Sequence, residues 1–443
     1  MDILQEALTM LERHPLCDHC LGRQFALLGH GIENDTRGNA IKMVLTLRAH
    51  AALSKDTEAV RTLKVLATNG FSEIARELLR KAKKRVRVDF TQRICFLCEG
   101  KLEATESFAQ KAVNILAPYE YHNFLVGTEL PKKVEEREDE FKSEFGVAYG
   151  ENMRNEFGRL IGKKVAELIG KPVDFLRPEI VVLVNPYADI VNLQINPLFI
   201  AGRYKKLVRG IPQSKWFCSN CRGRGCEKCN WTGKMYPESV EEIIAKPFLE
   251  VTYGMKSSFH ASGREDIDAR MLGTGRPFVL EITKPQKRFV DLEKLERATN
   301  NFGKGKVQIS SLHFADKDVV RRLKKGEAAQ KEYRVLIEFE NTIKDKDMRL
   351  LEKKLKNTLI AQKTPVRVVH RRADLTREKY IYDVNVKKLS PRKAEMKIRC
   401  QGGLYVKELV TGDGGRTTPS ISEILKNKAK PMKLDVLRVI MED

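Results

Sequence analysis

The most informative stretch of the chain reads HASGREDIDARMLGTGRPF and spans residues 260–278. It holds three carboxylates, three arginines and three glycines within 19 residues. The glycines and Pro277 predict a structured loop and not a solvated helix. Arginines beside a carboxylate lower its pKa and keep it ionised and oriented. An ionised carboxylate suits a nucleophile better than a general acid, and on this chemistry Asp266 and Asp268 are both candidates.

The chain around this stretch is strongly basic. Its 443 residues include 81 Lys+Arg against 59 Asp+Glu, which gives a net charge of +22. The commonest partner of such a positive field is a phosphate backbone. Charge for solubility and the Lys and Glu enrichment of heat-adapted proteins are the alternatives, but heat adaptation raises both signs together. The charge therefore favours a nucleic-acid-binding protein.

Nothing in the sequence predicts a membrane span or a secretory signal. No apolar run reaches the roughly 18 residues that a transmembrane helix needs. The N-terminal stretch MDILQEALTMLERHPLC is amphipathic and lacks the apolar core and the cleavage site of a signal peptide. We therefore expect a cytoplasmic protein whose nine cysteines are thiols or metal thiolates.

Eight of the nine cysteines fall into two clusters. The first consists of two CxxC pairs, CDHC at 17–20 and CFLC at 95–98, and the second is CSNCRGRGCEKC at 218–229. Two such pairs complete a tetrahedral site, and neither cluster has an open coordination position, so we expect two structural zinc sites. Buried thiols or a redox CxxC pair are the alternatives. The expected ligands are Cys17, Cys20, Cys95, Cys98, Cys218, Cys221, Cys226 and Cys229.

Two other residues near this chemistry have simpler interpretations. His19 lies inside the first CxxC pair, but four cysteines already satisfy an ion. Cys400 falls on a predicted strand, and we interpret it as a small buried residue because no histidine lies near it in sequence.

The pattern of the chain predicts three regions. Residues 1–100 are predicted helical, with the Asn69–Gly70 break inside the last helix. Residues 101–213 mix helices and strands, and residues 214–443 alternate strands with few long helices, which predicts an α+β domain with a large, mostly antiparallel sheet. The predicted helices are 3–11, 41–53, 58–86, 152–169, 292–301 and 345–361, and the predicted strands are 179–184, 190–195, 278–282, 333–339, 366–369, 380–386, 395–400 and 434–441. The basic stretch GRYKKLVRG at 202–210 suits either an RNA backbone contact or a solvated strand edge.

Three motifs give the chain a family resemblance. GRED at 263–266 resembles the Gly-Arg-x-Asp motif of pseudouridine synthases, and its continuation to Phe278 is similar to the archaeal tRNA enzymes that act on the TΨC arm at tRNA positions 54 and 55. KEYRVLI at 331–337 and IRCQGGLYVKELVTGDGGRTTPS at 398–420 resemble two further motifs of that family, in the same order. The resemblance implies a multidomain α+β protein: a helical zinc-binding region at 1–100, a THUMP-like RNA-binding domain at 101–213, and a catalytic domain at 214–443 with a zinc-knuckle-like insert at 218–229.

The resemblance also implies residue roles. Asp266 would be the nucleophile, which attacks either the sugar C1′ or the uracil C6. Tyr333 would stack on the flipped uracil, Tyr405 would contact the base, and Lys407 would lie against the catalytic carboxylate. Arg264 would fill the space that the flipped nucleotide leaves.

Each of these residues also has an ordinary structural interpretation. Tyr333 could be part of the core, and Tyr405 and Lys407 could be an exposed pair on one face of a strand.

The implied function is the isomerisation of uridine to pseudouridine in tRNA. This reaction is redox-neutral, so we expect no organic cofactor, and no GxxxxGK[ST] phosphate loop is present. We expect a monomer that acts on tRNA. The alternatives are a different THUMP-bearing tRNA-modifying enzyme, which would need a glycine-rich nucleotide loop, and a zinc-containing RNA-binding protein without catalytic activity.

Overall fold

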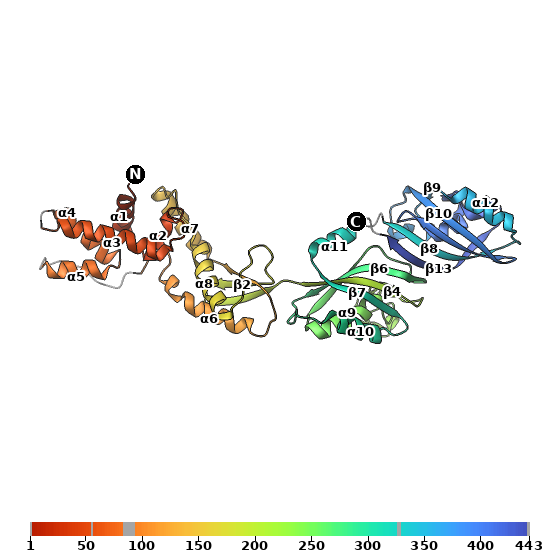
Figure 1. The fold of residues 1–443 in the computed structure, drawn as a ribbon, viewed down its shortest axis with the longest axis horizontal. Helices are drawn as coiled ribbons and strands as arrows, with labels where there is room; N and C mark the ends of the chain where they lie inside the picture. Colours follow the sequence, from red (N-terminus) through yellow and green to blue (C-terminus); the bar gives the residue numbers. More distant parts are fainter. Residues whose placement is uncertain (1, 55, 83–93, 326–328, 441–443) are drawn as a thin grey trace. The chain divides into compact units, whose positions relative to one another are not determined.

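The chain forms two compact units. The computed structural model describes residues 2–54, 56–82, 94–325 and 329–440, and it divides into Met1–Asn196 and Pro197–Asp443 (Figure 1). The division lies upstream of residue 213, because β4 (Leu198–Lys206) pairs with strands of the second unit. The three domain boundaries expected from the sequence remain a prediction. Among the described residues, no helix combines the length and apolar character needed to cross a membrane.

The first part of the first unit is helical, as the sequence predicts. Local signals start the helices: the side chains of Asp2, Asp56 and Ser72 each accept a hydrogen bond from the first turn of the helix that follows. The predicted helix 58–86 is two helices separated at the Asn69–Gly70 break, and residues 83–86 lie outside the described residues. The elements are α1 (Ile3–Arg13), α2 (Asp18–Gly22), η1 (Arg23–Phe25), α3 (Asn34–Ala52), α4 (Thr57–Thr68) and α5 (Glu73–Lys81).

The rest of the first unit is a small α/β layer. β1 (Phe124–Thr128) runs parallel to β2 (Ile180–Asn185), which pairs antiparallel with β3 (Ile190–Ile195). The helices here are η2 (Lys101–Ala104), α6 (Thr105–Leu116), α7 (Lys132–Glu144) and α8 (Met153–Ile169). α8 packs on β1 and on α6. It ends at Gly170, which has the positive φ of 67° expected of a helix stop.

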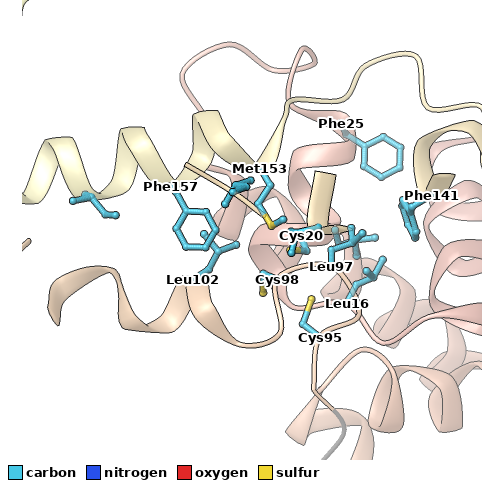
Figure 2. Packing of buried hydrophobic residues seen from close by; sticks show 14 of the residues in the cluster. Leu16, Cys20, Phe25, Cys95, Leu97, Cys98, Leu102, Phe141, Met153 and Phe157 are labelled. Atoms are coloured by element: carbon cyan, nitrogen blue, oxygen red, sulfur yellow. The ribbon is translucent and has the colours of Figure 1, made fainter. Parts of the chain in front are cut away.

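One continuous apolar core joins the helical part of the first unit to its sheet. Figure 2 shows Leu16, Leu97, Leu102 and Met153 near Cys20, Cys95 and Cys98, with Phe141 and Phe157 farther out in the same core. These three cysteines are buried. The first cysteine cluster therefore packs against the core through these three residues, and its fourth member, Cys17, is partly exposed.

The second unit is built on a ten-stranded sheet of mostly antiparallel pairs, as the sequence predicts. Its order is β12-β9-β10-β11-β8-β13-β6-β4-β7, with β5 paired to β6, and the pairing of β13 with β6 is parallel. The strands besides β4 are β5 (Lys256–Ala261), β6 (Ala269–Thr283), β7 (Val307–Ala315), β8 (Gln330–Phe339), β9 (Thr358–Lys363), β10 (Thr376–Ser390), β11 (Lys393–Cys400), β12 (Thr417–Thr418) and β13 (Ala429–Ile440).

Helices cover parts of this sheet. α9 (Val240–Thr252) and α10 (Leu292–Phe302) pack in the core beside β4 and β7, and α12 (Asp345–Leu355) packs on β10 (Figure 1). The remaining helical elements are η3 (Glu227–Cys229), α11 (Lys317–Lys325), η5 (Val366–Arg371), α13 (Val406–Thr411), η6 (Asp413–Gly415) and α14 (Ile421–Leu425).

Several local predictions in the second unit are wrong. Residues 366–369 form the 3-10 helix η5 and not a strand, and the helix predicted over 345–361 ends at Leu355, after which β9 begins. Asn357 marks that break with a φ of 53°. The loop predicted over 260–278 is short, because Ala269 already begins β6 and Pro277 lies within that strand.

The first half of the basic stretch at 202–210 is not a solvated sheet edge, and its basic side chains alternate between partly exposed, at Arg203 and Lys205, and buried, at Lys206. β4 lies between β6 and β7, and Tyr204 and Lys206 are fully buried. This position in the sheet, and not the local composition, decides what these side chains contact.

Candidate active site

The five residues singled out in the sequence as substrate or catalytic residues line one cavity of the second unit. The cavity has a volume of about 550 Å³. The segments that contribute to it include the turn before β6, strand β8, the region of η5, the start of α13, the segment after β4, and strands β5, β6 and β13. Its lining includes Arg264, Asp266, Tyr333, Tyr405 and Lys407. Residues more than a hundred positions apart in sequence thus meet at one place.

The turn that carries the carboxylates, residues 262–268, is called the carboxylate loop below. It connects the end of β5 to the start of β6. Gly263 has a φ of 76°, and an added Cβ there would lie 3.1 Å from Lys331 Nζ. A residue with a side chain would therefore strain both the backbone and its contacts.

The inner side of the carboxylate loop is held by a buried ion pair. Glu265 Oε2 lies 2.9 Å from Arg276 Nε, and the two side chains are 0% and 1% exposed. The Tyr204 hydroxyl donates to both Glu265 oxygens, at 3.1 and 2.9 Å. Burial and the neighbouring Glu265 charge raise the pKa of Tyr204, so its proton stays in place for these bonds. Arg276 also donates to the carbonyl of Ser262 at 2.6 Å, which ties the pair to the start of the loop.

Lys206 holds the backbone on the other end of the carboxylate loop. Its buried Nζ donates to the carbonyls of Asp266 at 3.0 Å, Ile267 at 3.2 Å and Ile211 at 2.9 Å. Gln213 adds a bond from Nε2 to the carbonyl of Gly263 at 3.0 Å. Strand β4 and the segment after it therefore fix the loop by side-chain donors to its main chain.

The outer side of the carboxylate loop presents Asp266 and Asp268 to one lysine. Lys407 Nζ lies 3.2 Å from Asp266 Oδ2, and 2.7 and 2.8 Å from the two oxygens of Asp268. The Asp266 side chain is 37% exposed and that of Asp268 is 68% exposed. Asp266 also lines the large cavity, whereas Asp268 does not line it. The geometry separates two carboxylates that local chemistry alone leaves equivalent.

A second cation, Arg367, contacts Asp266. Its Nη2 lies 3.3 Å from Asp266 Oδ2, and its Nε donates to Glu408 Oε1 at 2.6 Å. Burial raises the pKa of Asp266, but the charges of Arg367 and Lys407 outweigh burial, so that the pKa falls below its usual value. The carboxylate is thus held ionised at the edge of the cavity.

The sequence does not predict Arg367 as a site residue, because the pattern of its segment is that of a strand. The alternating, β-branched run at 366–369 predicts a strand, whereas the structure has η5 there. The signal that was available is the density of arginines in VRVVHRR, at 366–372.

Two tyrosines contribute to the cavity wall. Tyr333 is half-buried on β8, and burial raises its pKa. Tyr405 precedes α13, so Tyr405 and Lys407 do not share a strand face as the sequence pattern predicts. The hydroxyl of Tyr405 accepts a bond from Arg372 Nη1 at 2.9 Å, and the Arg367 guanidinium lies 5.7 Å from its ring centre. Both aromatic rings thus line the same cavity, and that of Tyr405 lies beside two arginines.

Arg264 belongs to the carboxylate loop and lines the large cavity. Its guanidinium is 5.9 Å from the centre of the Trp216 ring. Trp216 comes from the segment between β4 and α9, which also contains the second cysteine cluster. Cys400, in contrast, is fully buried on β11, and burial raises its pKa to about 12, in agreement with a packing residue.

The first cysteine cluster brings together two segments that are far apart in sequence. The sulfurs of Cys17, Cys20, Cys95 and Cys98 lie within 4.8 Å of one another, and Cys17 Sγ is 3.7 Å from Cys98 Sγ. His19 is not part of this group, because its Nδ1 lies 2.7 Å from Glu156 Oε1.

The second cysteine cluster is local. The sulfur pairs Cys218–Cys226 and Cys221–Cys229 are both 3.8 Å apart. The main-chain N–H groups of Gly225 and Gly233 donate to Cys221 and Cys229, each at 3.2 Å. The amide of Asn220 donates to the sulfur of Cys226 and lowers its pKa to about 6.

Both cysteine clusters fit a tetrahedral metal ion. Zinc–sulfur bonds of about 2.3 Å place neighbouring sulfurs roughly 3.8 Å apart, which agrees with the observed separations of 3.7 and 3.8 Å. Four thiols leave no position for a substrate or water, so the clusters are compatible with structural metal sites such as zinc.

Comparisons with known proteins agree with this architecture. The family described as "Pus10, C-terminal" matches residues 199–440, and the one described as "Pus10 THUMP domain, archaeal" matches residues 108–185. The tRNA pseudouridine synthase Pus10 of Methanocaldococcus jannaschii is 46% identical over 440 residues, covering 97% of this chain and 93% of the relative. That of Methanothrix thermoacetophila is 40% identical, covering 99% and 94%.

The tRNA pseudouridine synthase Pus10 of Methanopyrus kandleri is 37% identical and covers 100% of this chain and 99% of the relative. A chain of the crystal structure of a Cbf5-Nop10-Gar1 complex aligns over 46% of each chain at 16% identity with a TM-score of 0.28, too low to argue from. The near-full-length identities place this chain in the archaeal Pus10 family of THUMP-containing tRNA pseudouridine synthases, which are isomerases.

Proposed function

We propose that this chain isomerises uridine to pseudouridine in the TΨC arm of tRNA, at positions 54 and 55, with Asp266 as the nucleophile. The observation that carries this proposal is the position of Asp266. It is the one aspartate of the carboxylate loop that lines the 550 Å³ cavity, and two cations contact it there. An ionised carboxylate in such a cavity is suited to attack on carbon.

The reaction moves the glycosidic bond of uridine from N1 to C5 of the uracil. Asp266 would attack the nucleoside at the sugar C1′ or at uracil C6. The N1–C1′ bond breaks, the base turns, and the C5–C1′ bond forms. The bond between Asp266 and the carbon it attacked breaks, which releases the carboxylate. The proton on C5 is lost to restore the uracil ring, and N1 takes up a proton. Lys407 and Arg367 would keep Asp266 deprotonated for this attack, since both lower its pKa.

The other cavity residues would hold the base in place. Tyr333 would stack on the flipped uracil, and Tyr405 would contact its edge. Arg264 would fill the space that the flipped nucleotide leaves in the RNA. The half-buried position of Tyr333 within the cavity supports a stacking role.

The test is an isomerisation assay on two unmodified tRNA transcripts, each of which keeps only one of the two target uridines. Wild-type protein should form pseudouridine in both transcripts. Asp266→Ala should form none, and Asp268→Ala should retain activity. An active Asp266→Ala beside an inactive Asp268→Ala would overturn the nucleophile assignment, and modification of only one transcript would overturn the dual target.

The remaining parts of the proposal concern the whole chain. The region 1–100 would hold a structural zinc ion, 101–213 would bind tRNA, and 214–443 would carry the reaction and a second zinc ion. Elemental analysis should find two zinc ions per chain, and fewer than about one would contradict both sites. We also propose a cytoplasmic monomer, for which sedimentation should give a mass near 50.6 kDa.

A further inference from the structure

A smaller cavity adjoins the proposed active site. Its volume is about 190 Å³, and it shares Asp266 and Arg264 with the large cavity. The side chains that matter here are Trp216, Arg264, Asp266, Asp268, Arg367 and Lys407. Trp216 is the aromatic member of this lining, and it does not line the large cavity.

The position of Trp216 is fixed by its own segment. The Tyr236 ring meets the Trp216 ring edge-on at 5.7 Å, with an interplanar angle of 78°. The carbonyl of Trp216 accepts a bond from Met235 N at 2.9 Å, and the next residue, Phe217, pairs with Lys234 in an antiparallel bridge. The second cysteine cluster lies in sequence between these two paired segments and forms the connection between them. The segment thus delivers one aromatic ring to the edge of the site.

The surroundings of Trp216 suit a nucleotide. Its ring faces the Arg264 guanidinium at 5.9 Å, and Arg367 lies on the same cavity. Aromatic rings bind bases of any sequence by stacking, and arginines bind the phosphates that join them. A ligand in the small cavity would lie beside Asp266, and therefore next to whatever occupies the large cavity.

We propose that Trp216 is a stacking platform for the base of the nucleotide that neighbours the target uridine in tRNA. This inference rests on the proposed function, since it takes the large cavity as the site of the target uridine. Arg264 rests over the Trp216 ring in the free protein. It leaves the ring when it fills the gap of the flipped nucleotide, and the neighbouring base then takes its place.

The first test is a double-mutant cycle between protein and RNA. Trp216→Ala is combined with tRNA carrying an abasic nucleotide on the 5′ or the 3′ side of the target, and single-turnover rates are measured at subsaturating protein. Each change alone should lower the rate constant about 5- to 150-fold, the range for one stacked base. For the abasic nucleotide on one of the two sides, the double change should lower the rate constant no more than Trp216→Ala alone does. Losses that multiply on both sides would overturn the proposal.

Two variants separate stacking from a structural role. Trp216→Phe should recover most of the rate, whereas Trp216→Leu, which is apolar but cannot stack in the same way, should not. Trp231→Ala is the matched control, because Trp231 lies in the same segment, is 73% exposed and lines neither cavity. Its effect should multiply with that of each abasic nucleotide. Equal rates for the Phe and Leu variants would contradict stacking.

The second test does not depend on activity or on the stability of a Trp216 variant. The chain has two tryptophans, so Trp231→Phe leaves Trp216 as the sole indole fluorophore. In an Asp266→Asn background, tRNA should quench this fluorescence, and tRNA with an abasic nucleotide on one of the two sides of the target should bind with less quenching. Equal quenching by intact and abasic tRNA would overturn the proposal. The isomerisation assay of Asp266→Ala reports separately on the proposed function.

Discussion

The two sides of the carboxylate loop use charge in different ways. On the inner side, Glu265 and Arg276 are almost completely buried and pair with each other at 2.9 Å. On the outer side, Asp266 and Asp268 share Lys407 at the edge of the cavity and remain partly exposed. The inner pair has almost no exposed surface, although both residues belong to the cavity lining, and it fixes the backbone. On the outer side, Asp266 is partly exposed in the cavity and can reach a substrate. Neighbouring residues of one loop thus divide into those that set its shape and those that are placed for chemistry.

The largest effect should come from breaking the inner ion pair. Arg276→Met removes the nearer of the two cations of the buried Glu265 carboxylate and leaves only Lys206, whose Nζ lies 4.0 Å from Oε1. Removing one partner of a buried ion pair costs about 3–5 kcal/mol, or roughly two to four orders of magnitude in the folding equilibrium. Denaturant unfolding of the full chain measures this loss in the free energy of unfolding. Adding Glu265→Leu should recover part of the loss, since it removes the buried charge that has lost its nearer partner. If Arg276→Met lowers the free energy of unfolding by less than about 1 kcal/mol, the inner side of the carboxylate loop does not have the structural role described here.

A smaller effect should follow from removing the cation on the outer side. Lys407 lowers the pKa of Asp266, so Lys407→Met should raise that pKa. Because Asp266 attacks only when deprotonated, the acid limb of the pH–kcat/KM profile should move to higher pH, by about one unit or more. Lys407→Arg keeps the charge and should restore most of the profile. An unchanged acid limb in Lys407→Met would contradict the proposed control of Asp266.

The smallest effect should come from Asp268→Asn. Asp268 is 68% exposed and does not line the large cavity. Asp268→Asn removes a charge that competes with Asp266 for the Lys407 ammonium group. The acid limb of the pH–kcat/KM profile should therefore move slightly to lower pH, which is the direction opposite to that expected for Lys407→Met. The rate at neutral pH should change less than about threefold, the range in which exposed ion pairs act. A larger loss in the same assay would place Asp268 in the chemistry.

The sequence predicts the parts of this site that local signals determine. GRED and the two later motifs identify Asp266, Tyr333 and Lys407, and the structure brings them to one cavity. Helix α8 is predicted closely because its apolar period and Gly170 are both local.

What the sequence does not predict depends on strand order. Tyr204 and Lys206 belong to a basic stretch that the sequence pattern places at the surface. They are buried because β4 lies between β6 and β7. Arg367 meets Asp266 because η5 and the carboxylate loop line one cavity of the folded sheet domain, a contact across about a hundred residues. Lys407 lies on a helix of six residues, too short for its period to be distinguished from that of a strand.

The most direct measurement compares two adjacent isosteric variants, Asp266→Asn and Glu265→Gln, for single-turnover pseudouridine formation and for the midpoint of thermal unfolding. Asp266→Asn should keep the wild-type midpoint and lose at least about 10³-fold in rate. Glu265→Gln should lower the midpoint and keep measurable activity at temperatures where it is folded. Wild-type activity in Asp266→Asn would contradict the assignment of Asp266 as the nucleophile.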